Sequence, residues 1–330
     1  MRFGAMIQPL RHRLFATAMP TVLTRDQLDT WQREGVLVWP GFASAESIDG
    51  LRLRAAEIVE AFAPDPADPA ERAVFSSRDR AQLSQRALAA SADQVRCFFE
   101  EEAFDAEGRL VVDKARAINK IGHALHDRDP VFSRFSRDVR LAHLASELGV
   151  IDPLLMQSML IFKQPRIGGE VVWHQDASFL ITEAKETSGR SQVSAAPSGG
   201  RSPYGDLGGA PGVVGLWWAL EDATRDNGCL WVAPGGQRGP LRERYVRRGD
   251  GFVTERLDTT PWPSGDDIRP LEVKAGTLVV FDGLLPHASA PNRSAQSRLA
   301  YSLHIVSGRA AWSPLNWLQR RADDPARGFA

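Results

Sequence analysis

The first part of the chain carries apolar residues at helical spacing. Thr24 opens a T-x-x-Q pattern closed by Gln27, which is typical of a capped helix start, and Gly35 marks the end of this helix. The short apolar run 36–39 then predicts a strand. Ser44 is placed to cap a second helix, which the prolines after residue 63 end. The predicted apolar face of this second helix consists of Ile48, Leu51, Ala55, Ile58, Val59 and Phe62.

The pattern changes in the second half of the chain. The segment 70–149 is charged and mainly helical in pattern, with an amphipathic stretch at 139–148. From residue 154 onward, short runs rich in Val, Ile, Leu, Phe and Trp alternate with Gly, Pro and Asn, which predicts strands. We place these strands at 154–162, 171–174, 213–220, 229–232, 271–273, 278–282 and 299–306. Many short strands without alternating helices indicate a sandwich or a jelly roll.

We expect one folded domain with a tail at each end and one long insertion. The expected division is a domain at 24–320, with a helical flank at 24–150 and a jelly-roll core at 151–310, and tails at 1–23 and 321–330, the first of them disordered. Gly, Ser and Pro dominate the insertion at 185–212, which predicts a mobile loop. Because its ends adjoin the candidate site described below, we interpret it as a lid, with a passive surface insertion as the alternative.

Composition and charge exclude several classes of protein. The chain has 330 residues, 43% of them hydrophobic and 25% charged, as in folded globular proteins. Its formal charge of -1 predicts no attraction to nucleic acid, and no apolar run approaches the ~20 residues of a membrane helix. Cys97 and Cys229 lie too far apart for a CxxC site or a disulfide framework, which favours a reducing compartment. We therefore expect a cytoplasmic protein, with a mitochondrial transit peptide in the acid-free, Arg-containing N-terminus as the alternative.

Three residues form a candidate metal site. His174 and Asp176 make an H-x-D pair at the end of a predicted strand, where alternation turns both side chains to one face. Such a pair is weak evidence alone, but His287, which follows the predicted strand 278–282, supplies a third ligand. Two imidazoles and one carboxylate are the ligand set of non-haem Fe(II), which leaves positions open for a cosubstrate and O2. A zinc hydrolase is disfavoured, because no Glu base stands near these ligands.

Arg298 is placed to serve the same site. It begins the predicted strand that follows His287, so an antiparallel return brings its guanidinium towards the metal. Arginine stays charged and binds a carboxylate through two parallel hydrogen bonds, as recognition of a dicarboxylate requires. A surface arginine at the start of a strand is the ordinary alternative. The order of H-x-D, a distant His and then Arg is much more specific than any of its parts.

With these residues the chain resembles the phytanoyl-CoA dioxygenase family of Fe(II)/2-oxoglutarate oxygenases. The segments that carry the resemblance are I-N-K-I-G-H-A-L-H at 118–126, Q-S-M-L-I-F-K-Q-P, G-G-E and H-Q-D-A-S-F-L within 157–180, A-L-E-D-A-T-R-D-N-G-C-L-W at 219–231 and W-S-P-L-N-W-L-Q at 312–319. The resemblance extends from Thr24 to Gln319. Its main departures are the N-terminal tail and the insertion at 185–212, neither of which touches a motif.

The resemblance implies a double-stranded β-helix, a jelly roll of the cupin type, braced by the N-terminal helices. It implies His174, Asp176 and His287 as iron ligands and Arg298 as the partner of the distal carboxylate of 2-oxoglutarate. Five further positions match cosubstrate contacts of the family: Lys120, Met159, Gln175, Trp217 and Ser289. From the residues alone, Met159 and Trp217 would be core residues and Lys120 a solvated charge.

The sequence therefore predicts a dioxygenase that uses Fe(II), 2-oxoglutarate and O2 to hydroxylate a small organic substrate, with release of succinate and CO2. Two alternatives stay open: a cupin-like metal-binding protein, and a metal-dependent hydrolase or isomerase on the same scaffold. Neither alternative needs a carboxylate-binding site made by Arg298 and Lys120. Such a site therefore distinguishes the dioxygenase from both alternatives.

Other charged residues have weaker assignments. A basic cluster offers a place for the phosphates of an acyl-CoA, but runs of charge are usually solvated, so we do not favour that substrate. Its members are Arg238, Arg242, Arg244, Arg247 and Arg248. His123 and His126 have no carboxylate partner in the pattern, and we interpret them as structural or substrate-facing. No protein partner is inferred.

Overall fold

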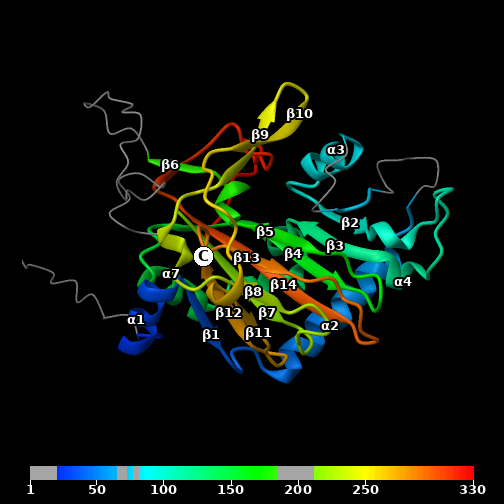
Figure 1. Cartoon of the computed structure of the whole chain (residues 1–330). Coiled ribbons are helices and arrows are strands. Elements are labelled where there is room, and N and C mark those ends of the chain that lie inside the picture. Colours follow the sequence, from blue (N-terminus) through cyan, green and yellow to red (C-terminus); the bar gives the residue numbers. More distant parts are fainter. Residues whose placement is uncertain (1–20, 65–72, 77–81, 185–211) are drawn as a thin grey trace, which may run out of the picture.

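The computed structural model describes residues 21–64, 73–76, 82–184 and 212–330 (Figure 1). Most of the expected N-terminal tail and nearly all of the insertion lie outside these ranges, so the predictions of a disordered start and of a lid stay predictions. None of the described helices is both long and apolar enough to traverse a membrane.

The first elements follow the sequence pattern closely. α1 (Arg25–Glu34) begins at a capping box in which Thr24 and Gln27 exchange hydrogen bonds, as predicted. It ends at Gly35, whose φ of 69° is the left-handed conformation that glycine adopts without strain. β1 (Val36–Trp39) follows directly.

The α-helices of the described residues all lie in the first half of the chain. α2 (Ala45–Ala61) is capped by Ser44 and buries the predicted apolar stripe, with Ile58 and Phe62 only partly covered. The remaining helices are α3 (Gln82–Ala90), α4 (Lys114–Ala117), α5 (Leu125–Arg128), α6 (Pro130–Ser136) and α7 (Val139–Glu147), with short 3-10 helices η1 (Glu101–Ala103), η2 (Asp176–Ser178), η3 (Gly236–Arg238) and η4 (Gly265–Asp267).

A large antiparallel sheet forms the centre of the fold. Its strands, in spatial order, are β1, β12 (Leu278–Asp282), β7 (Val213–Ala219), β14 (Arg298–Ser307), β4 (Pro153–Lys163), β3 (Ile118–His123) and β2 (Val95–Phe99). β2 and β3 lie in the segment expected to be a helical flank, and that expectation is wrong for them. β3 is buried along its whole length and therefore lacks the alternation that reveals a half-exposed strand.

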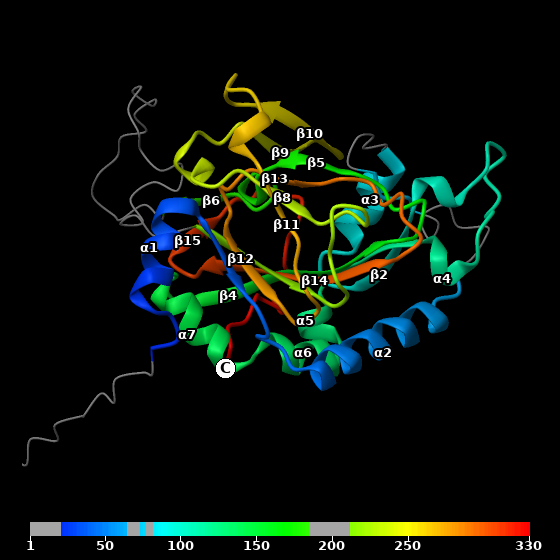
Figure 2. The same cartoon turned by 60° about the horizontal axis from the view of Figure 1, so that its bottom comes forward.

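A smaller antiparallel sheet faces the large one. Its strands are, in order, β11 (Arg269–Leu271), β8 (Leu230–Val232), β13 (His287–Ser289) and β5 (Val171–His174). Two further pairs join β9 (Glu243–Arg248) to β10 (Gly251–Arg256) and β6 (Thr182–Ala184) to β15 (Ala310–Trp312). Two facing antiparallel sheets braced by helices are the jelly roll that the sequence predicts. Figure 2 shows the small sheet on one side of the large sheet, with α2, α5, α6 and α7 on the other.

Alternating residues of the large sheet build two separate cores. In β7, Leu216 and Trp218 pack in the core beneath the helices, whereas Trp217 and Ala219 pack in the core shared with the small sheet, beside Leu230. The interior between the two sheets is therefore accessible to side chains from both, and the candidate site lies there.

The predicted strands match the structure unevenly. Those at 171–174 and 278–282 are observed with the predicted bounds, and the strand predicted at 271–273 lies at Arg269–Leu271 instead. Val273 forms only an isolated bridge to Ala223, which explains the displacement. The pattern missed the strands β6, β9, β10, β13 and β15, most of which are short or exposed on one face.

At both ends of the described chain, residues that the sequence analysis assigns to tails pack against the domain. Leu23 is buried, and the N–H groups of Val22 and Leu23 donate to the Glu147 carboxylate at 2.7 and 2.8 Å. At the other end, Leu155 N–H donates to the Arg327 carbonyl at 2.9 Å, and Phe329 packs against the core beneath the helices. The expected tail at 321–330 is therefore part of the domain.

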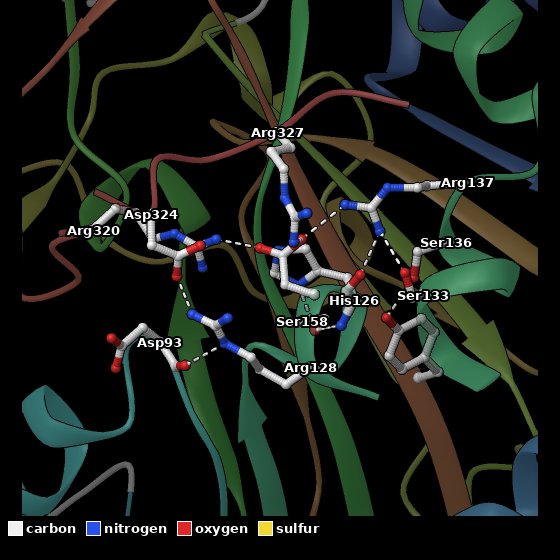
Figure 3. Close-up of polar contacts among 12 residues, drawn as sticks. Asp93, His126, Arg128, Ser133, Ser136, Arg137, Ser158, Arg320, Asp324 and Arg327 are labelled. Atoms are coloured by element: carbon white, nitrogen blue, oxygen red, sulfur yellow. Dashed lines mark hydrogen bonds and ion pairs between the residues drawn. The ribbon is translucent and has the colours of Figure 1, made fainter. Parts of the chain in front are cut away.

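A buried carboxylate anchors this C-terminal segment. The side chain of Asp127 is fully buried and pairs with Arg137 at 2.8 Å, with Arg327 at 3.1 Å and with Arg320. The three arginines converge beside His126, as Figure 3 shows. Burial alone would raise the pKa of Asp127, but neighbouring His126 and the paired arginines hold it far below its usual range.

We expect Asp127→Ala to lower the free energy of unfolding at pH 7 by ~3–5 kcal/mol, because it leaves buried guanidinium groups unpaired. The stabilisation by a carboxylate of depressed pKa is complete above its unfolded pKa of about 4 and is lost as the pH falls further. Urea unfolding at several pH values measures both effects. Asp324→Ala, which removes a more exposed partner of Arg128, is the control and should cost much less.

Candidate metal centre

Two neighbouring strands of the small sheet bring the three predicted metal ligands together. β5 ends at His174, β13 begins at His287, and these two residues are direct partners across the antiparallel pair. Asp176 begins η2 just after β5. One ligand atom from each of the three residues lies within 4.8 Å of the others.

Hydrogen bonds to the main chain set the tautomer of both histidines. His174 Nδ1 lies 2.8 Å from the Val172 carbonyl, and His287 Nδ1 lies 3.0 Å from the Leu285 carbonyl. Because a carbonyl oxygen only accepts, both Nδ1 atoms carry the proton and both Nε2 atoms present a lone pair. Burial, helped by neighbouring His287, lowers the pKa of His174 to about 3, so its imidazole is neutral at physiological pH.

The carboxylate of Asp176 completes the ligand set. Its Oδ1 lies 3.8 Å from His174 Nε2 and 3.7 Å from His287 Nε2, and its Oδ2 accepts a hydrogen bond from His304 Nε2 at 3.0 Å. Burial alone would raise the pKa of Asp176, but neighbouring His304, which donates this hydrogen bond, holds it well below its usual range. Two neutral imidazoles and one ionised carboxylate are what a divalent cation of the Fe(II) type binds.

A cavity of about 180 Å³ between the two sheets contains these ligands, and Arg298 lies on its wall. Arg298 begins β14 and is only 2% exposed, yet its Nε and Nη1 atoms have no hydrogen-bond partner among the described residues. Its guanidinium carbon lies 5.6 Å from the ring centre of Trp217. Burial lowers the pKa of Arg298 to about 10, so the side chain remains charged at neutral pH. A buried cation with unused donors facing a cavity indicates an anionic ligand.

Most of the predicted cosubstrate contacts lie on the same cavity wall. Lys120, Met159, Trp217 and Ser289 all line it. Lys120 is buried on β3, where its Nζ lies 3.4 Å from the ring centre of Phe75, and burial lowers its pKa to about 7. The structure therefore gathers a second basic group at the site, in a position where the sequence alone suggested only a solvated charge.

Gln175 is the exception among these predicted contacts. It does not line the cavity, because its side chain binds the main chain on the far side. Its Nε2 donates to the carbonyls of Pro240 and Leu284 at 3.1 and 2.8 Å, and its Oε1 accepts from Arg242 N–H at 3.0 Å. Gln175 thus ties the strand that carries His174 to the turn that precedes His287, and this is its role in the structure.

A close contact between β7 and β12 in the large sheet places an aromatic ring against His287. A Cβ atom on Gly215 would lie 2.4 Å from the Phe281 ring, so only glycine leaves room for this ring. The Phe281 ring in turn lies 4.7 Å from the imidazole of His287, centre to centre. The side chains of the large sheet therefore help to fix the orientation of a ligand on the small sheet.

The sequence missed His304 as a site residue. It lies on β14 and lines the cavity. Alternation along the predicted strand contained the signal, because His304 and Arg298 are separated by an even number of positions and so point to the same face. No H-x-D-like neighbour marks this histidine in the sequence.

The remaining candidate residues, two histidines and the arginine cluster, differ in whether they lie at the cavity. His123 lines the cavity, whereas His126 lies outside it and contacts Asp127, with its Nδ1 2.7 Å from Ser158 Oγ. Three members of the arginine cluster have partners within the protein: Arg238 binds main-chain carbonyls of α1, Arg242 donates to the Pro261 carbonyl, and Arg248 pairs with Glu255.

The fold and the site together define a jelly-roll protein with a two-histidine, one-carboxylate metal centre. The sequence model of the family described as Phytanoyl-CoA dioxygenase (PhyH) matches residues 31–300, and the chain belongs to this family. A phytanoyl-CoA dioxygenase of Arabidopsis thaliana is 40% identical over 301 residues, which are 90% of this chain and 94% of the relative. Phytanoyl-CoA dioxygenase domain-containing protein 1 of Bos taurus is 39% identical over 310 residues, which are 92% of this chain and 97% of the relative.

Solved structures share the fold. The apo form of EctD from S. alaskensis has a TM-score of 0.56 at 20% identity and covers 93% of this chain and 85% of its own. The epimerase SnoN, in complex with Fe3+, alpha ketoglutarate and nogalamycin RO, has a TM-score of 0.55 at 14% identity and covers 90% of this chain and 89% of its own. EctD has also been solved with bound Fe and with 2-oxoglutarate. At these identities the likeness establishes the jelly-roll fold.

Proposed function

We propose that the protein is an Fe(II)- and 2-oxoglutarate-dependent oxygenase that hydroxylates a small organic substrate. The observation that carries this proposal is the placement of Arg298, a buried cation with unused donors, in the cavity that also holds His174, Asp176 and His287. The PhyH family and the fold shared with iron- and 2-oxoglutarate-binding proteins support it.

The residues present fit the proposed metal and cosubstrate. The two Nε2 lone pairs and Asp176 Oδ1 are turned toward one point and would hold Fe(II) from one side. The guanidinium of Arg298 would bind the distal carboxylate of 2-oxoglutarate, with Trp217 beside it. When bound, the iron supplies the oxidising chemistry, with O2 as oxidant and conversion of 2-oxoglutarate to succinate and CO2. The protein orients the ligands and keeps the site enclosed.

The two alternatives explain Arg298 less well. A metal-binding protein without turnover, or a metal-dependent hydrolase or isomerase, needs the metal ligands but has no use for a buried arginine in the same cavity whose Nε and Nη1 have no partner among the described residues. Burying such a charge without a partner is costly, and an anionic cosubstrate accounts for it.

The cavity favours a compact substrate. Apolar residues form much of the wall beyond the ligands, including Phe98, Phe179 and Trp317, and they suit a small molecule with a hydrocarbon part. An acyl-CoA stays the less favoured substrate, because three of the five arginines expected to hold its phosphates bind groups of the protein itself.

The test is detection of succinate that depends on Fe(II), 2-oxoglutarate and O2, with a library of small metabolites as candidate substrates. We expect a subset of compounds to stimulate succinate formation and to gain one oxygen atom. Oxidation of a compound without consumption of 2-oxoglutarate would favour a different metal-dependent enzyme.

The pKa of Lys120 leads to a pH dependence of cosubstrate binding. Only the protonated amine attracts the carboxylates of 2-oxoglutarate, and this amine loses its proton in the empty cavity above a pKa of about 7. We expect the affinity for 2-oxoglutarate to fall above pH 7, by up to about tenfold per pH unit. Anaerobic binding measured from pH 6 to pH 9 checks this, and Lys120→Met should bind more weakly at pH 6 and lose most of the slope. An equal slope in that variant would assign the titration to another group.

A further inference from the structure

We propose that His304 positions Asp176 with one ring nitrogen and accepts a hydrogen bond from the substrate with the other. This inference deepens the proposed function and rests on it. His304 lies in the middle of the large sheet on β14, where Gln157 of β4 and Gly215 of β7 are its partners, and it is 3% exposed. A side chain so enclosed by neighbouring strands has little freedom to turn.

The hydrogen bond from His304 gives the two oxygens of the Asp176 carboxylate different roles. An ionised carboxylate only accepts, so His304 Nε2, 3.0 Å from Oδ2, must carry the proton of this bond. Oδ2 is thereby engaged, and Oδ1 is the oxygen that faces His174 and His287. His304 therefore selects which oxygen is presented to the metal and holds the carboxylate plane in place.

The second nitrogen of His304 is an unused acceptor. With Nε2 protonated, Nδ1 of the neutral ring carries a lone pair, and it is buried without a partner among the described residues. Because His304 lines the cavity, a ligand in the cavity is the natural partner for this lone pair.

His123 presents a second acceptor in the same cavity. Ser91 Oγ lies 2.6 Å from the Leu88 carbonyl and must use its one proton there, so it accepts from His123 Nδ1 at 2.7 Å. The proton of His123 is thus on Nδ1, and Nε2 is left with its lone pair. Burial lowers the pKa of His123 well below its usual value, which keeps the ring neutral. His123 also lines the cavity.

The two acceptors define a class of substrate. A pure hydrocarbon would leave both lone pairs unsatisfied, whereas a molecule with hydroxyl or N–H groups satisfies them. We therefore expect a substrate that carries at least one such donor close to the carbon that is oxidised, together with a hydrocarbon part that contacts the apolar wall.

The positioning role is tested with Fe(II) alone, by anaerobic equilibrium dialysis that involves no turnover. The ε-amide of glutamine places an N–H near the position of His304 Nε2, whereas the shorter amide of asparagine does not reach it. We expect His304→Leu and His304→Asn to weaken Fe(II) binding by about 10–100-fold, and His304→Gln to stay close to wild type. Thermal unfolding of each variant verifies that it is folded. If the Leu variant does not fold, the Fe(II) affinities of the Gln and Asn variants still test the positioning role.

His143→Leu is the matched control, because it removes a buried histidine that lies on α7 and does not line the cavity. It should leave Fe(II) affinity unchanged. Wild-type affinity in the Asn variant, or equal losses in the Asn and Gln variants, would overturn the positioning role. Since this assay needs neither cosubstrate nor substrate, its result is separate from the success or failure of the proposed oxygenase activity.

The substrate role is tested with the compound that stimulates succinate formation most strongly in the library assay. We expect the derivative with its donor group methylated to have a KM at least about tenfold higher than the parent compound. His123→Phe should remove much of this preference while Fe(II) affinity stays at the wild-type value. A best compound without any hydroxyl or N–H group, or equal use of the parent and the methylated form, would overturn the acceptor role.

Discussion

Asp176→Ala is expected to abolish iron-dependent formation of succinate while the protein still unfolds cooperatively. The substitution removes the only carboxylate of the ligand set found among the described residues and leaves two imidazoles, which hold Fe(II) too weakly to support turnover. Succinate formation measured with saturating Fe(II) and 2-oxoglutarate checks the activity, and a urea unfolding curve checks the fold.

Asp222→Ala is the control for this substitution, since Asp222 forms a surface ion pair with Lys274. It should retain full activity. Turnover at the wild-type level in Asp176→Ala would show that Asp176 is not a ligand.

Arg298→Ala is expected to raise the apparent KM for 2-oxoglutarate by roughly 30-fold or more, because losing a charge-assisted pair to a buried carboxylate costs ~2–5 kcal/mol. Arg298→Lys should recover only part of the loss, since an ammonium group lacks the planar fork that binds a carboxylate through two hydrogen bonds. Initial rates of succinate formation over a range of 2-oxoglutarate concentrations give the constant for each variant.

Arg293→Ala is the matched control, because Arg293 lies nearby in sequence but pairs with Glu102 at the surface. Its KM for 2-oxoglutarate should equal that of the wild type. An unchanged KM in Arg298→Ala would mean that the cosubstrate is held elsewhere, and the buried guanidinium would then need another explanation.

The meeting of His174, Asp176 and His287 was predictable from the sequence because its signals are local. The H-x-D pair stands at the end of a strand with clear apolar character, and His287 follows another. These two strands lie in different sheets, but the turn after β12 leads directly into β13, which pairs with β5 and so brings His287 opposite His174. The capping residues of α1 and α2 were predictable for the same reason, since each depends on side chains within one turn of helix.

Other features depend on contacts between distant segments. β2 and β3 belong to the large sheet, but the fully buried β3 has no alternation to distinguish it from a helix segment. Gln175 lies between two ligands in sequence, and only the three-dimensional structure shows that its amide is used by Pro240, Leu284 and Arg242. The burial of Lys120 likewise follows from the packing of its neighbours rather than from its own flanking residues.

The central claim is that one cavity binds Fe(II) and 2-oxoglutarate together, and anaerobic binding of 2-oxoglutarate measures this without any need for the substrate. In equilibrium dialysis without O2, we predict one 2-oxoglutarate bound per chain, with an affinity that rises strongly when Fe(II) is added and with no such rise in Asp176→Ala. Binding that is absent, or that is the same with and without Fe(II), would contradict the proposal.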